Sequence, residues 1–101
     1  MATVFVPQES PGKNLLPAEA FGELSVIFNP KQQVMLSPGP AVNQLNHALR
    51  NFSDDDYLLL IGDPVLVGVC CSIAAKFNRG MYKVLKWDRQ EHKYYVIQVQ
   101  I

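Results

Sequence analysis

The chain has 101 residues, of which 49% are hydrophobic, so we expect one globular domain with a single modest core. Its nine basic and nine acidic residues cancel, which excludes a strong overall attraction to nucleic acid or to an anionic membrane but leaves room for a local charged patch. The N-terminus lacks the basic and long apolar regions of a signal peptide. These features predict an intracellular protein, with residues 1–101 in one α/β domain and a partly irregular segment at residues 1–22.

Short strands and loops are predicted for the first forty residues. The three short strands are expected at residues 3–6, 23–28 and 33–36. Pro7 should stop the first strand, and the loop before the second has room for one helical turn after Pro17. Alternation in the second strand predicts one well-buried face, which consists of Leu24, Val26 and Phe28.

An amphipathic surface helix is predicted from about Ala41 to Phe52. Its apolar face consists of Val42, Leu45, Leu49 and Phe52. The opposite face is polar, so this helix should lie on the outside of the domain. A polar connection at residues 53–56 then leads into the next strand.

The centre of the fold is predicted at the apolar segment that follows. Residues 57–61 form a continuous apolar run of the length expected for a strand buried on both faces. Gly62 breaks this run, Asp63 offers an N-cap carboxylate, and Pro64 supplies a backbone angle suited to the first helical position. The pattern predicts a helix over residues 64–77.

This second helix carries more apolar surface than one contact can bury. Its sheet-facing side is predicted to consist of Leu66, Val69, Ile73 and Phe77. Gly68 and Ser72 lie one turn apart and permit the close approach of another backbone. Either the loop of the first twenty residues covers this helix or another subunit does, and the sequence leaves both alternatives open.

The last two strands are predicted at residues 81–87 and 94–101, joined as a hairpin. One face of the final strand is expected to belong to the core and the other to be half solvated. With the strands at residues 23–28 and 33–36 counted before the first helix, the element order is ββαβαββ. It predicts a small mixed sheet with at least three parallel strands, right-handed crossovers and an antiparallel edge. The fold class is therefore α/β, with two helices packed on the sheet, and one face of so small a sheet has room for both.

The carboxyl edge of the parallel strands is one candidate ligand site. Ligands of open α/β sheets bind beyond this edge, where helix N-termini attract anions. The candidate residues there are Ser37, Gly39, Gly62 and Asp63. However, the Asp63 carboxylate would repel an anion and Pro64 has no donor N–H. A helix cap is therefore the favoured interpretation, and a small-molecule or nucleotide site is the alternative.

No catalytic, metal or cofactor site is predicted. Cys70 and Cys71 are adjacent in an apolar helix, where burial raises a thiol pKa and an ordinary disulfide would be strained, so we expect two reduced thiols. His47 lies on the polar face of its helix and His92 in a hairpin turn, and the base–nucleophile geometry that an active thiol needs has no support. Adjacent cysteines also lack the usual spacing of zinc ligands.

The C-terminal hairpin is the main candidate for binding a partner. It mixes cations with aromatic rings, and aromatic and Arg side chains are the usual anchors of interfaces. The partner-binding candidates are Trp87, Arg89, Tyr82, Tyr94 and Lys86. The same mixture can contact phosphates and stack on bases, but a solvated edge hairpin has a similar composition.

The second half of the chain resembles small proteins encoded by tailed bacteriophages, particularly those that infect aquatic bacteria. The resemblance covers about residues 41–101. It is most specific at Asp56-Tyr57, at Gly62-Asp63-Pro64 and at residues 86–90, which read KWDRQ. It implies a phage origin and expression in a host cytoplasm, and it brings no site residue with it.

We therefore expect a non-enzymatic interaction or assembly protein without a cofactor, which binds a host or phage protein or a second copy of itself. A nucleic-acid-binding accessory protein that uses the hairpin is the first alternative. A small-molecule or nucleotide binder at the junction of residues 62–64 is the second. No binding to a membrane is expected.

Overall fold

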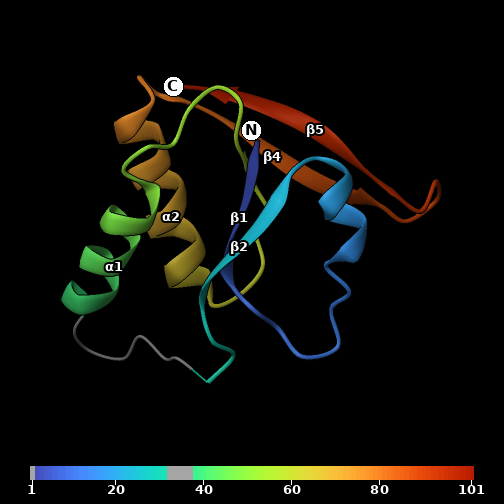
Figure 1. Cartoon of the computed structure of the whole chain (residues 1–101), viewed down its shortest axis with the longest axis horizontal. Helices are drawn as coiled ribbons and strands as arrows, with labels where there is room; N and C mark the ends of the chain where they lie inside the picture. The colour runs from blue at the N-terminus through green and yellow to red at the C-terminus, as the bar shows by residue number, and fades with distance from the viewer. Residues whose placement is uncertain (1, 32–37) are drawn as a thin grey trace.

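The computed structural model describes residues 2–31 and 38–101, and it confirms the predicted α/β fold. Strands and helical segments follow one another along the chain (Figure 1). In chain order the elements are β1 (Thr3–Gln8), the 3-10 helix η1 (Leu16–Ala20), β2 (Glu23–Phe28), α1 (Gly39–Leu49), β3 (Tyr57–Leu58), α2 (Pro64–Phe77), β4 (Met81–Asp88) and β5 (Lys93–Gln100). The strand predicted at residues 33–36 lies outside the described residues.

The strands form one mixed sheet in the order β2-β1-β3-β4-β5. The first four strands of this order are parallel, and β5 runs antiparallel to β4 as the second strand of the predicted hairpin. Two helical crossovers require three parallel strands. The sheet has a fourth, because the chain also crosses from β1 to β2 through η1. The prediction of a mixed sheet with an antiparallel edge is confirmed.

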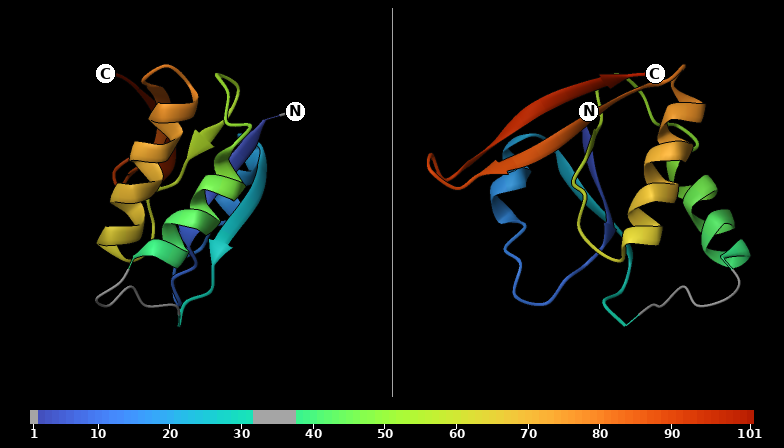
Figure 2. Two further views of the ribbon diagram at one scale, coloured as in Figure 1. Left: turned by 90° about the vertical axis from the view of Figure 1, so that its left-hand side faces the viewer. Right: turned by 180° about the vertical axis from the view of Figure 1, so that it is seen from behind.

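Helical segments cover both faces of this sheet (Figure 2). α1 and α2 pack against each other on one face, where the buried residues are Phe28, Leu45, Leu49, Phe52, Leu58, Leu66, Cys70, Ile73 and Ala74. The segment around η1 packs on the other face, where the buried residues are Val4, Val6, Ala18, Leu59 and Leu85. The alternative in which the loop of the first twenty residues covers α2 is therefore wrong, because that loop packs on the opposite side of the sheet.

β1 continues through Pro7, where the sequence pattern predicts its end. Pro7 has no partner in the register with β2, because proline donates no ladder hydrogen bond, but pairing resumes between Gln8 and Phe28. The Gln8 N–H also donates to Ile61 O (3.1 Å), so both neighbouring segments hold the chain beyond the proline. Pro7 leaves a gap in the ladder without ending the strand.

β3 is shorter than predicted. It has two residues, and only Leu58 pairs with β4, opposite Val84. Beyond this point the chain stays with β1, since Leu59 N–H donates to Phe5 O (2.9 Å), and it separates from β4. The prediction of a longer strand buried on both faces is therefore wrong at its carboxyl end, where Leu60 is 38% exposed.

α2 has the predicted bounds, and Asp63 is its N-cap. The Asp63 carboxylate accepts a hydrogen bond from Val65 N–H (2.8 Å). The buried side differs from the predicted one, because Phe77 is 38% exposed. The buried residues are Leu66, Cys70, Ile73 and Ala74. A helix that is apolar on almost every side gives little sequence signal for its orientation, which explains this error.

Both edge strands are more exposed than predicted. In β2, Val26 belongs to the face predicted to be buried but is 42% exposed. In β5, Tyr95 (41%), Val96 (41%) and Ile97 (39%) are equally exposed, although neighbouring residues of a strand point to opposite faces. The expectation that one face of β5 belongs to the core is therefore wrong, because the two helices pack over the central strands.

Candidate binding cleft beside the C-terminal hairpin

A cleft opens where β3 and β4 separate. The two strands are joined at the Leu58–Val84 pair, after which residues 59–61 follow β1 while β4 continues as one arm of the hairpin. The gap lies at the carboxyl ends of these parallel strands, on the face of the sheet that carries η1. Ligands of open α/β sheets bind outside the carboxyl ends of the strands, and this cleft lies on that side of the sheet.

The cleft has a volume of about 740 Å³. Residues from the N-terminal loop form one side of it, the segment that follows β3 forms the floor, and the hairpin forms the other side. The lining residues are Lys13, Asn14, Pro17, Leu59, Leu60, Ile61, Val84, Leu85, Lys86, Trp87, Arg89 and Tyr94. These residues include three cations and neither Asp nor Glu, so the cleft combines an apolar floor with a positively charged rim.

Two aromatic rings from the hairpin form one wall. Trp87 of β4 stands opposite Tyr94 of β5, and the two rings meet edge to face with centroids 4.9 Å apart. His92 also lies near Trp87, with 6.5 Å between the ring centroids. Tyr94 is partly buried, and this burial raises its pKa above the ordinary value. Trp87 is more open to solvent, with 40% of its surface exposed. The wall is therefore anchored by the tyrosine and presents the tryptophan.

Positive charge at the rim comes from two distant segments. Lys13 lies in the loop before η1, and Arg89 lies in the turn of the hairpin. Lys86 also borders the cleft, but strand alternation directs its side chain to the face opposite that of Trp87. The neighbouring Asp88 carboxylate accepts hydrogen bonds from the N–H groups of residues 90 and 91 and so shapes the turn.

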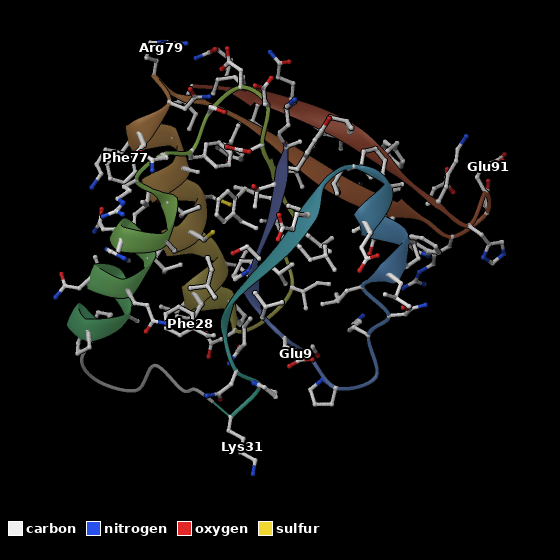
Figure 3. The ribbon with its side chains drawn as sticks, viewed as in Figure 1. Glu9, Phe28, Lys31, Phe77, Arg79 and Glu91 are labelled. Carbon is white, nitrogen blue, oxygen red and sulfur yellow. The ribbon has the colours of Figure 1, made fainter. Side chains whose placement is uncertain are left out.

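The structure brings four of the five hairpin candidates to this cleft: Trp87, Arg89, Tyr94 and Lys86. Tyr82 lies apart from them. It packs against the core on the α1–α2 face and shares a hydrogen bond with the thiol of Cys71. The tip of the hairpin, marked by Glu91 in Figure 3, projects away from α1 and α2.

Sequence reasoning missed the N-terminal side of the cleft, which consists of Lys13, Asn14 and Pro17. These residues lie in a stretch of turn formers that shows no periodicity. Their position beside the hairpin depends on the crossing from β1 to β2 over the η1 face. No local signal in the sequence indicates that crossing.

At the candidate ligand edge, the Gln8 side chain links the segments that follow β2 and β3. Its side-chain oxygen accepts a hydrogen bond from Asp63 N–H (2.8 Å), and its amide donates to Asn29 O (3.0 Å). Gly62 has φ +125°, and a Cβ added there would lie only 2.4 Å from the Gln8 Cβ. The Gln8 side chain thus connects Asn29 to Asp63, and the Asp63 carboxylate caps its own helix. This geometry favours the capping interpretation.

Of the other two residues of that edge, the structure describes only Gly39. Ser37 lies outside the described residues. Gly39 is the exposed first residue of α1, whose N-terminus has no side-chain cap. The three described ligand-edge candidates, Gly39, Gly62 and Asp63, therefore do not meet around one cavity.

The two cysteines are free thiols in different surroundings. Burial raises the pKa of Cys70 to about 12, and the neighbouring Cys71 adds to this effect. Burial also raises the pKa of Cys71, whereas the hydrogen bond with Tyr82 lowers it by a smaller amount. Both shifts favour the neutral thiol, which is a poor nucleophile.

Residues 2–31 and 38–101 contain neither a metal-binding cluster nor a membrane-spanning helix. Within these ranges, no three His, Cys, Asp or Glu side chains gather in a way that could hold a metal ion. Over the same ranges, no helix has both the length and the apolar character needed to cross a membrane.

Comparison with protein-family models identifies the relatives of this chain. The model of the Phage Pam3 gp32-like protein family matches residues 2–101. The chain belongs to this family. The resemblance to phage proteins is thereby confirmed, and it extends beyond the second half of the sequence to nearly all of it. Searches of curated proteins and of solved structures gave no match.

Proposed function

We propose that this phage protein is a non-enzymatic binding protein whose cleft takes a segment of a host or phage protein in the host cytoplasm. The observation that carries the proposal is the convergence of Trp87, Tyr94 and Arg89 with Lys13 on one open cleft. Trp, Tyr and Arg are enriched among the residues that dominate the free energy of protein–protein binding. The fold supplies these side chains on two different segments, which gives the site a defined shape.

The lining favours a segment that carries a carboxylate beside an apolar side chain. Arg89 and Lys13 provide positive charge without a lining acid to neutralise it, and Arg can bind a carboxylate through two parallel hydrogen bonds. Leu60 (38% exposed) and Trp87 (40% exposed) offer apolar surface that a bound side chain would cover. The two kinds of contact together predict preference for an acidic, partly apolar peptide segment.

A nucleic-acid ligand is the second candidate. The exposed ring of Trp87 beside Arg89 would let a base stack next to a phosphate contact. This candidate predicts an affinity that falls steeply as salt rises, because phosphate contacts release counterions. Absence of DNA and RNA binding at low salt would remove it and leave the protein partner.

The proposal is tested by capturing the partner from infected cells with tagged protein and then measuring the affinity of the purified complex. The double variant Trp87→Ala with Arg89→Ala removes the exposed ring and the rim charge together. We expect it to weaken binding by at least tenfold, since the loss of two interface anchors costs ~2 kcal/mol or more. Undiminished binding by the folded double variant would contradict the proposal.

A matched control removes the same types of side chain from the opposite side of the molecule. Phe77 is 38% exposed, close to the 40% of Trp87, and Arg50 is exposed at the end of α1. The variant Phe77→Ala with Arg50→Ala should bind the partner with unchanged affinity. An equal loss of affinity for the partner in both double variants would show that neither loss comes from the cleft.

A further inference from the structure

We propose that two copies of this chain associate through β5, which pairs antiparallel with β5 of the second copy and extends the sheet across a twofold axis. The inference is independent of the cleft, because it rests on the outer edge of the hairpin. In the described part of the chain, β5 has β4 as its only neighbouring strand. Its register with β4 is continuous from Lys93 to Gln100, with no bulge.

The phase of the ladder shows which backbone groups face outward. Ile101 N–H donates to Gly80 O (2.8 Å), so this pair is of the hydrogen-bonded kind. Hydrogen-bonded and non-hydrogen-bonded pairs alternate along an antiparallel ladder, so every second residue back from this pair directs its N–H and C=O toward β4. The residues between them, Tyr94, Val96 and Gln98, direct theirs to the outer edge. This edge therefore presents an ordered row of donors and acceptors.

The outer edge lacks the devices that usually prevent strand pairing. Natural edge strands carry prolines, charges or bulges that block the approach of another strand. Residues 94–100 contain no proline and no charged residue. Tyr95 (41% exposed), Val96 (41%) and Ile97 (39%) add apolar surface on both faces of the strand. A second strand here would cover apolar side chains and satisfy backbone groups at once.

The distribution of charge and side chains favours a second copy as the occupant. Lys93 is the only charged residue of β5. In an antiparallel pair of β5 strands, the Lys93 residues of the two copies lie at opposite ends of the interface. A twofold axis at Ile97 sets this residue opposite Ile97 of the second copy and sets Tyr95 opposite Val99 of the second copy. Apolar and aromatic–β-branched pairs of this kind stabilise antiparallel sheets.

The other edge of the sheet is less suited to pairing. β2 carries the charged Glu23, and Ile27 O already accepts a hydrogen bond from the Gln44 side chain (3.1 Å). Joining β5 to β2 of another copy would also be a head-to-tail contact, which builds open chains of molecules. Pairing of β5 with β5 is self-complementary, so the assembly closes as a dimer.

Light scattering after size exclusion, over a dilution series of the full chain, tests this inference. We expect the mass of two chains at high concentration and a shift to one chain for Ile97→Lys, which places a charge at the twofold axis. Val26→Lys is the matched control, because Val26 is 42% exposed on the opposite edge strand. This control should remain a dimer. Circular dichroism establishes that both variants are folded.

A second variant tests the pairing without weakening the interface between the two β5 strands. Directly opposite residues of antiparallel strands have Cβ atoms about 4.5–5.5 Å apart, and non-hydrogen-bonded pairs are closer, which approaches the distance of about 3.5–4.5 Å in a disulfide. Oxidised Ile97→Cys should therefore form a disulfide-linked dimer on a non-reducing gel. The wild type, which carries only the thiols of Cys70 and Cys71, should not. A wild-type monomer at every concentration, open-ended oligomers, or a dimer that survives Ile97→Lys would each overturn the inference.

Discussion

The rings of Trp87 and Tyr94 meet edge to face across the hairpin, with centroids 4.9 Å apart and planes inclined by 69°. The two residues are direct neighbours in the ladder between β4 and β5. Such a pair contributes about 0.5–1.5 kcal/mol beyond the apolar area that it buries. A partner that enters the cleft would therefore meet a tryptophan whose orientation is already fixed, which lowers the entropy cost of binding.

Gly62 is predicted to be intolerant of any side chain, because its backbone has φ +125° and a Cβ would lie 2.4 Å from the Gln8 Cβ. Gly62→Ala should lower the free energy of unfolding by about 2 kcal/mol or more, which urea denaturation would measure. It should also disturb the hydrogen bond between Gln8 and the Asp63 N–H.

Gly68 provides the control for this substitution. It lies within α2, and a Cβ there would meet nothing within 4 Å. Gly68→Ala should raise the free energy of unfolding by about 0.5–1 kcal/mol, because alanine favours the helix. A similar decrease in the free energy of unfolding for Gly62→Ala and Gly68→Ala would contradict this account of the Gln8–Gly62 contact.

The separation of β3 from β4 predicts different costs for two leucines in the same segment. Leu58 is fully buried, whereas Leu60 is 38% exposed at the cleft. Leu58→Ala should lower the free energy of unfolding by about 2–5 kcal/mol, because it leaves a cavity in the core. Leu60→Ala should cost less than about 1 kcal/mol. Equal costs in urea denaturation would indicate that residues 57–61 form one fully buried strand instead.

The buried thiols predict a loss of stability at alkaline pH. Burial raises the pKa of Cys70 from 9.0 to about 12, so between these values the folded chain holds a proton that the unfolded chain releases. Stability from this group is therefore complete below pH 9 and falls as pH rises toward 12. The raised pKa values of Cys71, Tyr82 and Tyr94 act in the same direction.

Urea denaturation from near-neutral pH to about pH 11 would measure this slope. Cys70→Ala removes one contributor, so its free energy of unfolding should fall less steeply above pH 9 than that of the wild type. If burial did not raise the pKa of Cys70, the free energies of unfolding of the two proteins would differ by the same amount at every pH.

Much of the local structure follows from the sequence. Asp63 and Pro64 combine a capping carboxylate with a residue suited to the first helical turn, and α2 begins where they predict. The hairpin is equally clear, because alternating strands flank a polar turn. In these segments the signal is local, so neighbouring residues suffice to define it.

The cleft depends on contacts that no local pattern reveals. Lys13 and Trp87 meet at one cavity although 74 positions separate them, because β1 pairs in parallel with β2 and the connecting segment packs on the η1 face. The apolar run of residues 57–61 also shows no sign that its second half leaves β4. Topology and strand divergence, which arise from packing of the whole sheet, decide both features.

The most direct measurement of the proposed binding cleft uses the fluorescence of Trp87, the only tryptophan of the chain. The captured partner is titrated into the wild type, and a parallel titration with Trp87→Phe subtracts the partner's own emission. Because 40% of the Trp87 side chain is exposed, we expect its emission to shift to shorter wavelength as the partner covers it. Unchanged Trp87 emission in a complex whose formation is established by mass would contradict the account.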